Sequence, residues 1–132
     1  MFAFIQARMG SSRLPGKMAL QLPDGKTLLE AVISRLGAHN VTPVLLTTTQ
    51  PTDNALVEIA NQLKLPVFRG DENHVLNRFT EAAKHFQISD DTFILRICAD
   101  NPYLSHWIID QTIQKTKELP QADYISYAHQ NK

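Results

Sequence analysis

Strand and helix signals alternate along this chain from end to end. Short apolar segments are typical of buried strands at residues 2–6, 43–49, 66–68 and 92–97. Apolar residues recur at helical spacing in the segments that follow them, at residues 28–36, 53–64, 75–86 and 105–113. Such alternation is the pattern of an α/β fold with a mainly parallel sheet. We therefore expect a Rossmann-like three-layer sandwich.

Several residues mark where these elements should begin or end. Gly37 should end the first helix, and Ser105 is a suitable N-cap for the last one. Residues 122–127 are expected to begin a fifth extended segment beyond the helix-breaking Pro120. The residues expected on the inner face of the third helix are Val75, Leu76, Phe79, Ala82, Ala83 and Phe86.

Composition narrows the class of protein. The 132 residues are enough for one domain, and we expect a single domain over residues 1–132. The 13 basic and 13 acidic residues give a net charge of zero, which favours neither a nucleic acid nor a membrane as partner. A single cysteine, Cys98, excludes an internal disulfide, and with no signal peptide we expect a cytoplasmic protein. The five histidines lack ligand-like spacing, which argues against zinc.

The loop at residues 6–17, directly after the first strand, concentrates groups that bind anions. It contains three cations, two hydroxyls and two glycines, and no acidic residue precedes Asp24. Backbone N–H groups exposed at glycine and fixed positive charges together suit a polyphosphate. The loop is not a Walker A motif, because five residues separate Gly10 from Gly16 and Met18 follows Lys17. A dinucleotide G-x-G-x-x-G pattern is also absent.

A carboxylate is expected at the same edge of the sheet. Asp100 follows the fourth strand, and parallel strands present their carboxyl ends together. Mg²⁺ prefers one or two carboxylates together with phosphate oxygens and water, so Asp100 is a candidate magnesium ligand. The alternative is a turn-capping aspartate ahead of Asn101 and Pro102.

Four ordered blocks of the sequence carry a resemblance to a known family. They are residues 6–17, 28–33, 66–78 and 96–102. Together they resemble the cytidylyltransferases that activate acidic sugars, which include the acylneuraminate and 3-deoxy-manno-octulosonate enzymes and the spore-coat polysaccharide branch. The resemblance spans nearly the whole chain but only about the first half of such an enzyme. It implies a truncated nucleotide-diphospho-sugar transferase (GT-A-like) fold.

The resemblance also implies roles for individual residues. Arg8, Lys17 and Asp100 would be catalytic, with Asp100 holding Mg²⁺ as the cofactor. The residues that would bind the nucleotide are Ala7, Arg8, Gly10, Ser11, Ser12, Arg13, Lys17, Arg69, Gly70 and Arg78. Arg78 has an equally strong interpretation as a surface helix residue that pairs with its neighbours. Cys98 replaces a small polar residue of the family, and we expect it to be buried as a small hydrophobic side chain.

The function expected from the resemblance is nucleotidyl transfer. CTP and an acidic sugar would give a CMP-sugar and pyrophosphate, for surface polysaccharide or glycan biosynthesis, by a protein that can form a homodimer. One alternative is a nucleotidyltransferase that acts on another sugar or cofactor with UTP or GTP. Another is a nucleotide-binding domain without turnover, because the second half of such an enzyme would supply the acceptor pocket and a further acidic metal ligand.

Overall fold

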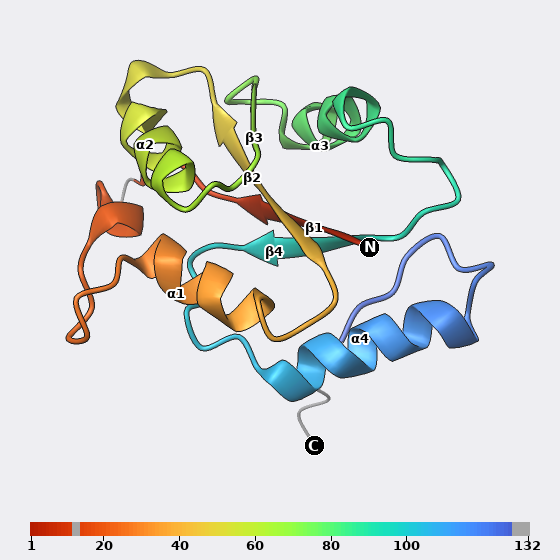
Figure 1. Cartoon of the computed structure of the whole chain (residues 1–132). Coiled ribbons are helices and arrows are strands. Elements are labelled where there is room, and N and C mark those ends of the chain that lie inside the picture. The colour runs from red at the N-terminus through yellow and green to blue at the C-terminus, as the bar shows by residue number, and fades with distance from the viewer. Residues whose placement is uncertain (12–13, 128–132) are drawn as a thin grey trace.

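The protein folds around one parallel sheet of four strands. Figure 1 presents the computed structural model, which describes residues 1–11 and 14–127. The strands are β1 (Phe2–Gln6), β2 (Thr42–Thr48), β3 (Val67–Gly70) and β4 (Ile94–Cys98), in the spatial order β3-β2-β1-β4. β1 pairs in parallel with β2 and β4, so that Gln6 lies between Leu46 and Cys98 at the carboxyl edge. The expected parallel α/β architecture is confirmed.

Four α-helices and two 3₁₀ helices connect the strands. They are η1 (Lys17–Ala19), α1 (Leu28–Leu36), η2 (Pro51–Asp53), α2 (Asn54–Gln62), α3 (Val75–His85) and α4 (His106–Glu118). α1 begins at a capping box, in which Glu30 N donates to Thr27 Oγ1 at 3.2 Å and Thr27 N donates to the Glu30 carboxylate at 2.6 Å. The expected caps at Gly37 and Ser105 are both present.

Alternate residues of the strands build a hydrophobic core on each side of the sheet. Ala3 and Ile5 of β1 face α1, α2 and α4, where their partners include Leu29, Leu56 and Ile109. Phe4, between them in the sequence, faces the other way and packs with Phe79 and Ala82 of α3 and with Phe86, the C-cap residue of that helix. Because successive side chains of a strand point to opposite faces, β1 supplies both cores and the three layers follow.

Three local expectations are wrong. Leu76 is 78% exposed, because it lies about 100° around α3 from Val75 and in the first turn of the helix. The fourth strand begins at Ile94, two residues later than expected. Residues 122–127 form no strand in the described structure, and they pass beside α4, where the rings of Tyr127 and Trp107 have centroids 5.3 Å apart. An extended segment becomes a strand only when it finds a hydrogen-bonding partner.

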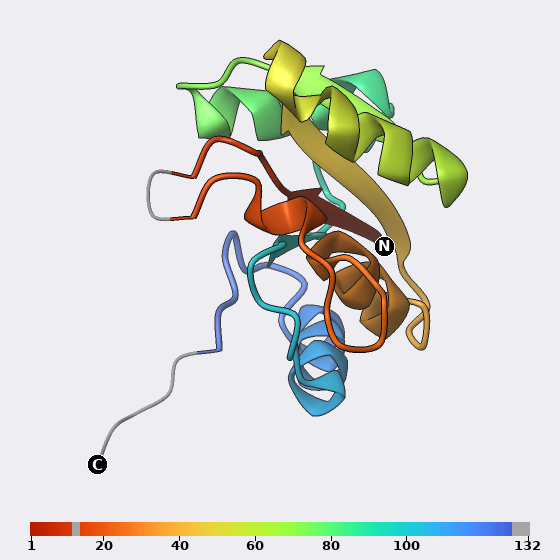
Figure 2. The same ribbon diagram turned by 90° about the vertical axis from the view of Figure 1, so that its left-hand side faces the viewer.

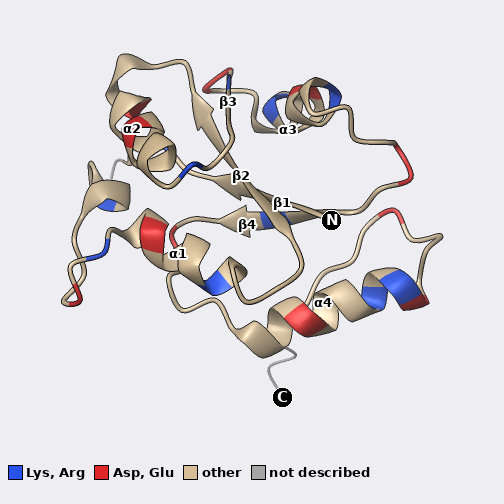
Figure 3. Ribbon diagram, in the orientation of Figure 1, with Lys and Arg blue, Asp and Glu red and all other residues tan. Residues whose placement is uncertain are grey.

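Charge is spread over the molecule. Acidic and basic residues occur on several helices and loops without separating onto opposite faces (Figure 3). None of the helices in the described ranges is long and apolar enough to cross a membrane.

Candidate functional site

A cleft of about 240 Å³ opens at the carboxyl edge of the sheet. The chain leaves β1 and β4 from the same edge, as Figures 1 and 2 show, and the two segments that follow these strands form the walls of the cleft. Its lining residues are Gln6, Ala7, Arg8, Gly10, Ser11, Lys17, Met18, Cys98 and Asp100. Six of these nine are residues expected to bind the nucleotide or the metal. The parallel topology therefore brings the loop and Asp100 together as predicted.

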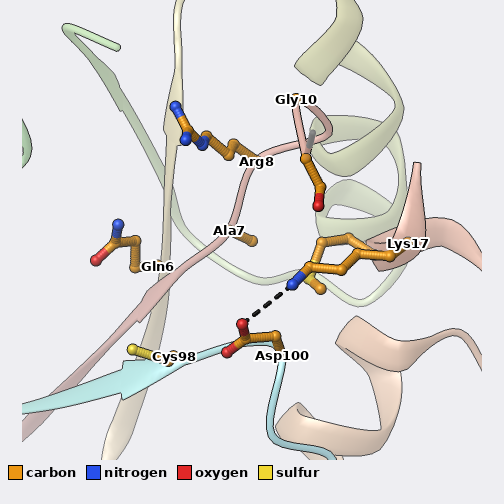
Figure 4. A pocket seen from close by; sticks show the side chains of 9 residues that line it. Gln6, Ala7, Arg8, Gly10, Lys17, Cys98 and Asp100 are labelled. Carbon is orange, nitrogen blue, oxygen red and sulfur yellow. Dashed lines mark hydrogen bonds and ion pairs between the residues drawn. The ribbon is translucent and has the colours of Figure 1, made fainter. Parts of the chain in front are cut away.

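Lys17 and Asp100 point toward each other across the cleft (Figure 4). Lys17 Nζ lies 3.0 Å from Asp100 Oδ2, although the two residues are 83 positions apart in the sequence. Gly16, with φ 72°, turns the chain so that Lys17 begins η1. A solvent-exposed ion pair of this kind contributes only about 0–1 kcal/mol. An anion that attracts the ammonium and a cation that attracts the carboxylate can therefore separate the pair at little cost.

The turn after β4 is closed by its backbone. Asn101 N donates to Cys98 O at 3.3 Å, while the Asp100 carboxylate accepts a hydrogen bond from Lys17. This arrangement leaves the carboxylate facing the cleft instead of capping the turn.

Arg8 extends from the loop away from the Lys17–Asp100 pair (Figure 4). Its Nη1 lies 3.7 Å from the Glu72 carboxylate, and half of the Arg8 side chain is exposed. At this distance and exposure the contact constrains the guanidinium weakly. Arg8 can thus turn toward an anion in the cleft. Ser12 and Arg13, also expected to bind the triphosphate, lie outside the described residues.

The loop backbone is folded back on itself at Met9. Met9 O accepts hydrogen bonds from Ser11 N at 2.8 Å and from Gly16 N at 3.1 Å. These two bonds bring the start and the end of the loop together, so Arg8 and Lys17 lie at neighbouring parts of the same rim. Sequence reasoning identified the composition of the loop, but the hydrogen-bond acceptor that closes it is a main-chain group with no signal in the sequence.

Arg69 is the next-to-last residue of β3, and its side chain binds neighbouring segments. Its guanidinium donates to Thr48 O at 2.8 Å, to Asn54 Oδ1 at 2.8 Å and to Gln50 O at 2.9 Å. Arg69 therefore ties the end of β2 to η2 and α2, and it does not line the cleft. Its expected contact with a nucleotide stays a prediction.

Arg78 is buried, with 1% of its surface exposed, so its interpretation as a surface helix residue is wrong. Its Nη1 donates to Asp71 O at 3.0 Å, and its Nε has no hydrogen-bond partner among the described residues. Burial lowers the pKa of the Arg78 guanidinium, and repulsion from Arg8 lowers it further. Gly70 makes room for this side chain, because a Cβ at residue 70 would lie 2.9 Å from Arg78 Cγ.

Gln6 and Cys98 also line the cleft, and the sequence analysis assigned neither to the site. They are register partners at the last position of β1 and of β4. Cys98 is exposed, so the expectation that it is buried is wrong. The signal that could have found both residues is strand register, since the last residues of adjacent parallel strands meet at the binding edge.

The single carboxylate of the cleft suits a metal that arrives with a ligand. Asp100 is the one acidic residue among those that line the cleft, and the described ranges contain no group of three potential metal-ligating side chains. A single carboxylate is enough for Mg²⁺ that keeps water and phosphate oxygens as its other ligands. The donor set therefore fits nucleotide-bound magnesium.

Comparison with known proteins assigns the family. The model of the cytidylyltransferase family matches residues 2–132. The chain belongs to this family. Proteins that it resembles include an uncharacterized protein of Methanocaldococcus jannaschii, with 42% identity over 112 residues, and the spore coat polysaccharide biosynthesis protein SpsF of Bacillus subtilis, with 34% identity over 118 residues. A 3-deoxy-manno-octulosonate cytidylyltransferase of Nitrosococcus oceani is 31% identical over 119 residues. These alignments cover 83%, 83% and 90% of this chain and 44%, 47% and 45% of the respective relatives.

Solved structures agree with this assignment. A cytidylyltransferase from Leptospira borgpetersenii is 38% identical and superposes with a TM-score of 0.75, over 86% of this chain and 47% of that one. A CMP:2-keto-3-deoxy-manno-octonic acid synthetase complexed with CTP has the same fold, with a TM-score of 0.73 at 21% identity, over 91% of this chain and 48% of that one. This cytidylyltransferase-family chain therefore spans about half the length of the relatives it matches.

Proposed function

We propose that this chain provides the nucleotide-binding half of a CTP-dependent cytidylyltransferase that converts an acidic sugar to a CMP-sugar and releases pyrophosphate. The observation that carries the proposal is the convergence of Lys17, Arg8 and Asp100 on one cleft at the carboxyl edge of β1 and β4. Family membership supports nucleotidyl transfer. The names of the Nitrosococcus oceani enzyme and of the CTP-bound synthetase support CTP and an acidic sugar.

In the proposed reaction, a sugar hydroxyl attacks the α-phosphorus of CTP. A new oxygen–phosphorus bond forms, the bond to the bridging oxygen of the β-phosphate breaks, and pyrophosphate leaves with the electron pair, while the proton of the sugar hydroxyl passes to water. No protein nucleophile is required, so catalysis consists of positioning and charge neutralisation. Lys17 and Arg8 would hold the phosphates and neutralise the charge that develops on pyrophosphate. Asp100 would hold Mg²⁺, which when bound polarises the phosphoryl oxygens.

The base of the nucleotide has a separate proposed contact region. Arg69, Gly70 and Arg78 would lie on the base and ribose side, as the family resemblance implies. The unpartnered Nε of Arg78 supports a role near the ligand, because a buried donor without an acceptor costs free energy. The same proposal includes a cytoplasmic location and a homodimer.

A nucleotide titration tests the proposal. Calorimetry with CTP, UTP, ATP and GTP, each with magnesium, should give the highest affinity for CTP. A preference for UTP or GTP would instead support a nucleotidyltransferase for another sugar or cofactor. CTP binding without pyrophosphate release in the presence of any sugar acid would support a binding domain without turnover.

The metal role of Asp100 is tested by Asp100→Asn, which preserves the shape of the side chain and removes its charge. We expect the factor by which magnesium raises CTP affinity to be smaller by about tenfold or more in this variant. The reason is that a hydrogen bond made by a charged group contributes about 1.5–3 kcal/mol. Asp24→Asn, an exposed turn residue, is the matched control. An unchanged magnesium dependence in Asp100→Asn would remove this residue from the metal site.

A further inference from the structure

Asp53 is a buried carboxylate that no part of the proposed reaction uses. Only 1% of its surface is exposed. Its Oδ2 accepts hydrogen bonds from Thr48 Oγ1 at 2.5 Å, from Thr47 Oγ1 at 3.0 Å and from Thr48 N at 3.1 Å. Its Oδ1 accepts from Met9 N at 2.7 Å, across 44 positions of sequence. A buried carboxylate with this many donors is held in its ionised form.

The position of Asp53 at a helix start does not explain these contacts. Asp53 is the N-cap residue of α2, yet its side chain makes no capping hydrogen bond. An N-cap aspartate normally accepts from an amide of the first turn of its own helix. Here both oxygens point instead to the end of β2 and to the loop that follows β1.

Met9 connects Asp53 to the rim of the cleft through its two backbone polar groups. Its amide is bound to Asp53, and its carbonyl oxygen accepts from Ser11 N and Gly16 N. Arg8 precedes this residue and Lys17 follows Gly16, so both cations of the cleft adjoin the hydrogen-bonded unit. The chain of contacts runs from β2 through Asp53 and Met9 to Gly16 and Lys17.

We propose that Asp53 is a positioning residue for the phosphate-binding loop. Its carboxylate fixes Met9 against the end of β2, and the Met9 carbonyl then fixes Gly16, so Arg8 and Lys17 are held where a triphosphate needs them. The expected effect of Asp53 on CTP affinity rests on the proposed function, whereas the anchoring of the loop does not depend on a ligand. A displacement of about 1 Å at such a site is enough to change a rate by about a hundredfold.

The test compares Asp53→Asn with Asp90→Asn, which removes one carboxylate charge from an exposed turn. Amide hydrogen exchange at Met9, Ser11 and Gly16 should become about tenfold faster or more in Asp53→Asn, because the amide side chain replaces one acceptor oxygen by a donor. Exchange at Phe4 in the centre of β1 should not change. Calorimetry should show CTP affinity falling by about tenfold or more while cytidine affinity stays the same.

Each outcome bears on one claim. Unchanged exchange at Met9 and Gly16 would overturn the anchoring. Equal losses of CTP and cytidine affinity would overturn the positioning of the phosphate site, since a merely structural defect affects both ligands. If the parent chain binds no CTP, the proposed function fails, while the exchange data still decide whether Asp53 anchors the loop.

A second variant covers the case in which Asp53→Asn does not fold. Thr48→Val removes the hydroxyl donor at 2.5 Å and leaves the carboxylate in place. It should show the same pattern in a milder form. Relative to the parent, exchange at Met9 and Gly16 should be accelerated more than exchange at Phe4, and the affinity for CTP should fall more than the affinity for cytidine. The opposite ranking would overturn the proposal.

Discussion

Lys17 and Arg8 should act on the triphosphate and not on the nucleoside, because both basic residues line the cleft at the carboxyl edge of β1 and β4. Lys17→Ala and Arg8→Ala are each expected to lower CTP affinity by about tenfold or more, since a hydrogen bond to a charged group contributes about 1.5–3 kcal/mol. Cytidine affinity should stay the same. Calorimetry with both ligands checks this, with the exposed Lys26→Ala as a control. Equal losses for the two ligands would place these residues outside the phosphate site.

Gly70 leaves no room for a Cβ beside Arg78 and Phe68. A Cβ there would lie 2.9 Å from Arg78 Cγ and 3.2 Å from a ring carbon of Phe68. Gly70→Ala should therefore lower the free energy of unfolding by about 1–3 kcal/mol, the usual cost of overpacking. Gly37→Ala is the matched control, because its φ of −62° is helical and the nearest atom would lie at 3.5 Å. Denaturant unfolding measures both variants, and equal stabilities would show that Arg78 moves aside freely.

Individual residues differ in how far the sequence predicts their place. Lys17 and Asp100 could be placed together because parallel strands end at one edge, a rule that needs only the order of the elements. The sequence could not predict the burial of Arg78 or the contacts of Asp53, since each depends on the packing of side chains distant in the sequence. The need for glycine at residue 70 can be recognised only when Arg78 is known to pack against it.

At the scale of elements, Asp53 joins β2, η2 and the loop after β1, and this junction should be sensitive to acid. Burial raises the pKa of Asp53, but hydrogen bonds from Thr48, Met9 and Thr47 outweigh it, so the pKa lies below its ordinary value. A carboxyl group with a lowered folded-state pKa stabilises the protein fully above its unfolded pKa of about 3.9. That contribution is lost as the pH falls from there through the folded pKa.

The expected result is a free energy of unfolding that decreases below about pH 4 in the parent and decreases less in Asp53→Asn. Urea unfolding from pH 7 to pH 3 measures the two slopes. The comparison isolates Asp53 from Glu30 and Asp71, whose pKa values are also lowered by hydrogen bonds from backbone N–H groups. Parallel curves for the parent and the variant would contradict the assignment.

Whole elements were predicted better than their ends. The four strands and four α-helices follow from apolar periodicity, and the predicted caps at Gly37 and Ser105 mark the end of α1 and the start of α4. Residues 122–127 have the composition of a strand, but pairing depends on a neighbouring strand, which local sequence does not specify. Asp53 shows the same limit, because its local context favours a helix cap while its carboxylate binds the distant Met9.

At the scale of the molecule, β4 is one of the two edge strands of the described sheet, and β3 is the other. Within the described residues, β4 pairs with β1 alone, so its other edge has no strand beside it. Trp107 is 56% exposed and Tyr127 is 52% exposed on the adjoining surface of α4 and its following segment. Open strand edges and exposed aromatic side chains both favour association with another polypeptide.

The 132-residue chain by itself should therefore bind CTP weakly, self-associate, and release little or no pyrophosphate with sugar acids. The cleft offers cations and one metal-ligating carboxylate, but the relatives it matches are about twice as long, and their additional half is expected to provide the acceptor pocket. Sedimentation over a range of concentrations measures the association, and a pyrophosphate-release assay with several nonulosonic and octulosonic acids measures turnover. Trp107→Ser should reduce self-association without changing CTP affinity, because this residue lies outside the cleft. Rapid turnover by a monomer would contradict this prediction, because it would show that the 132-residue chain suffices for catalysis.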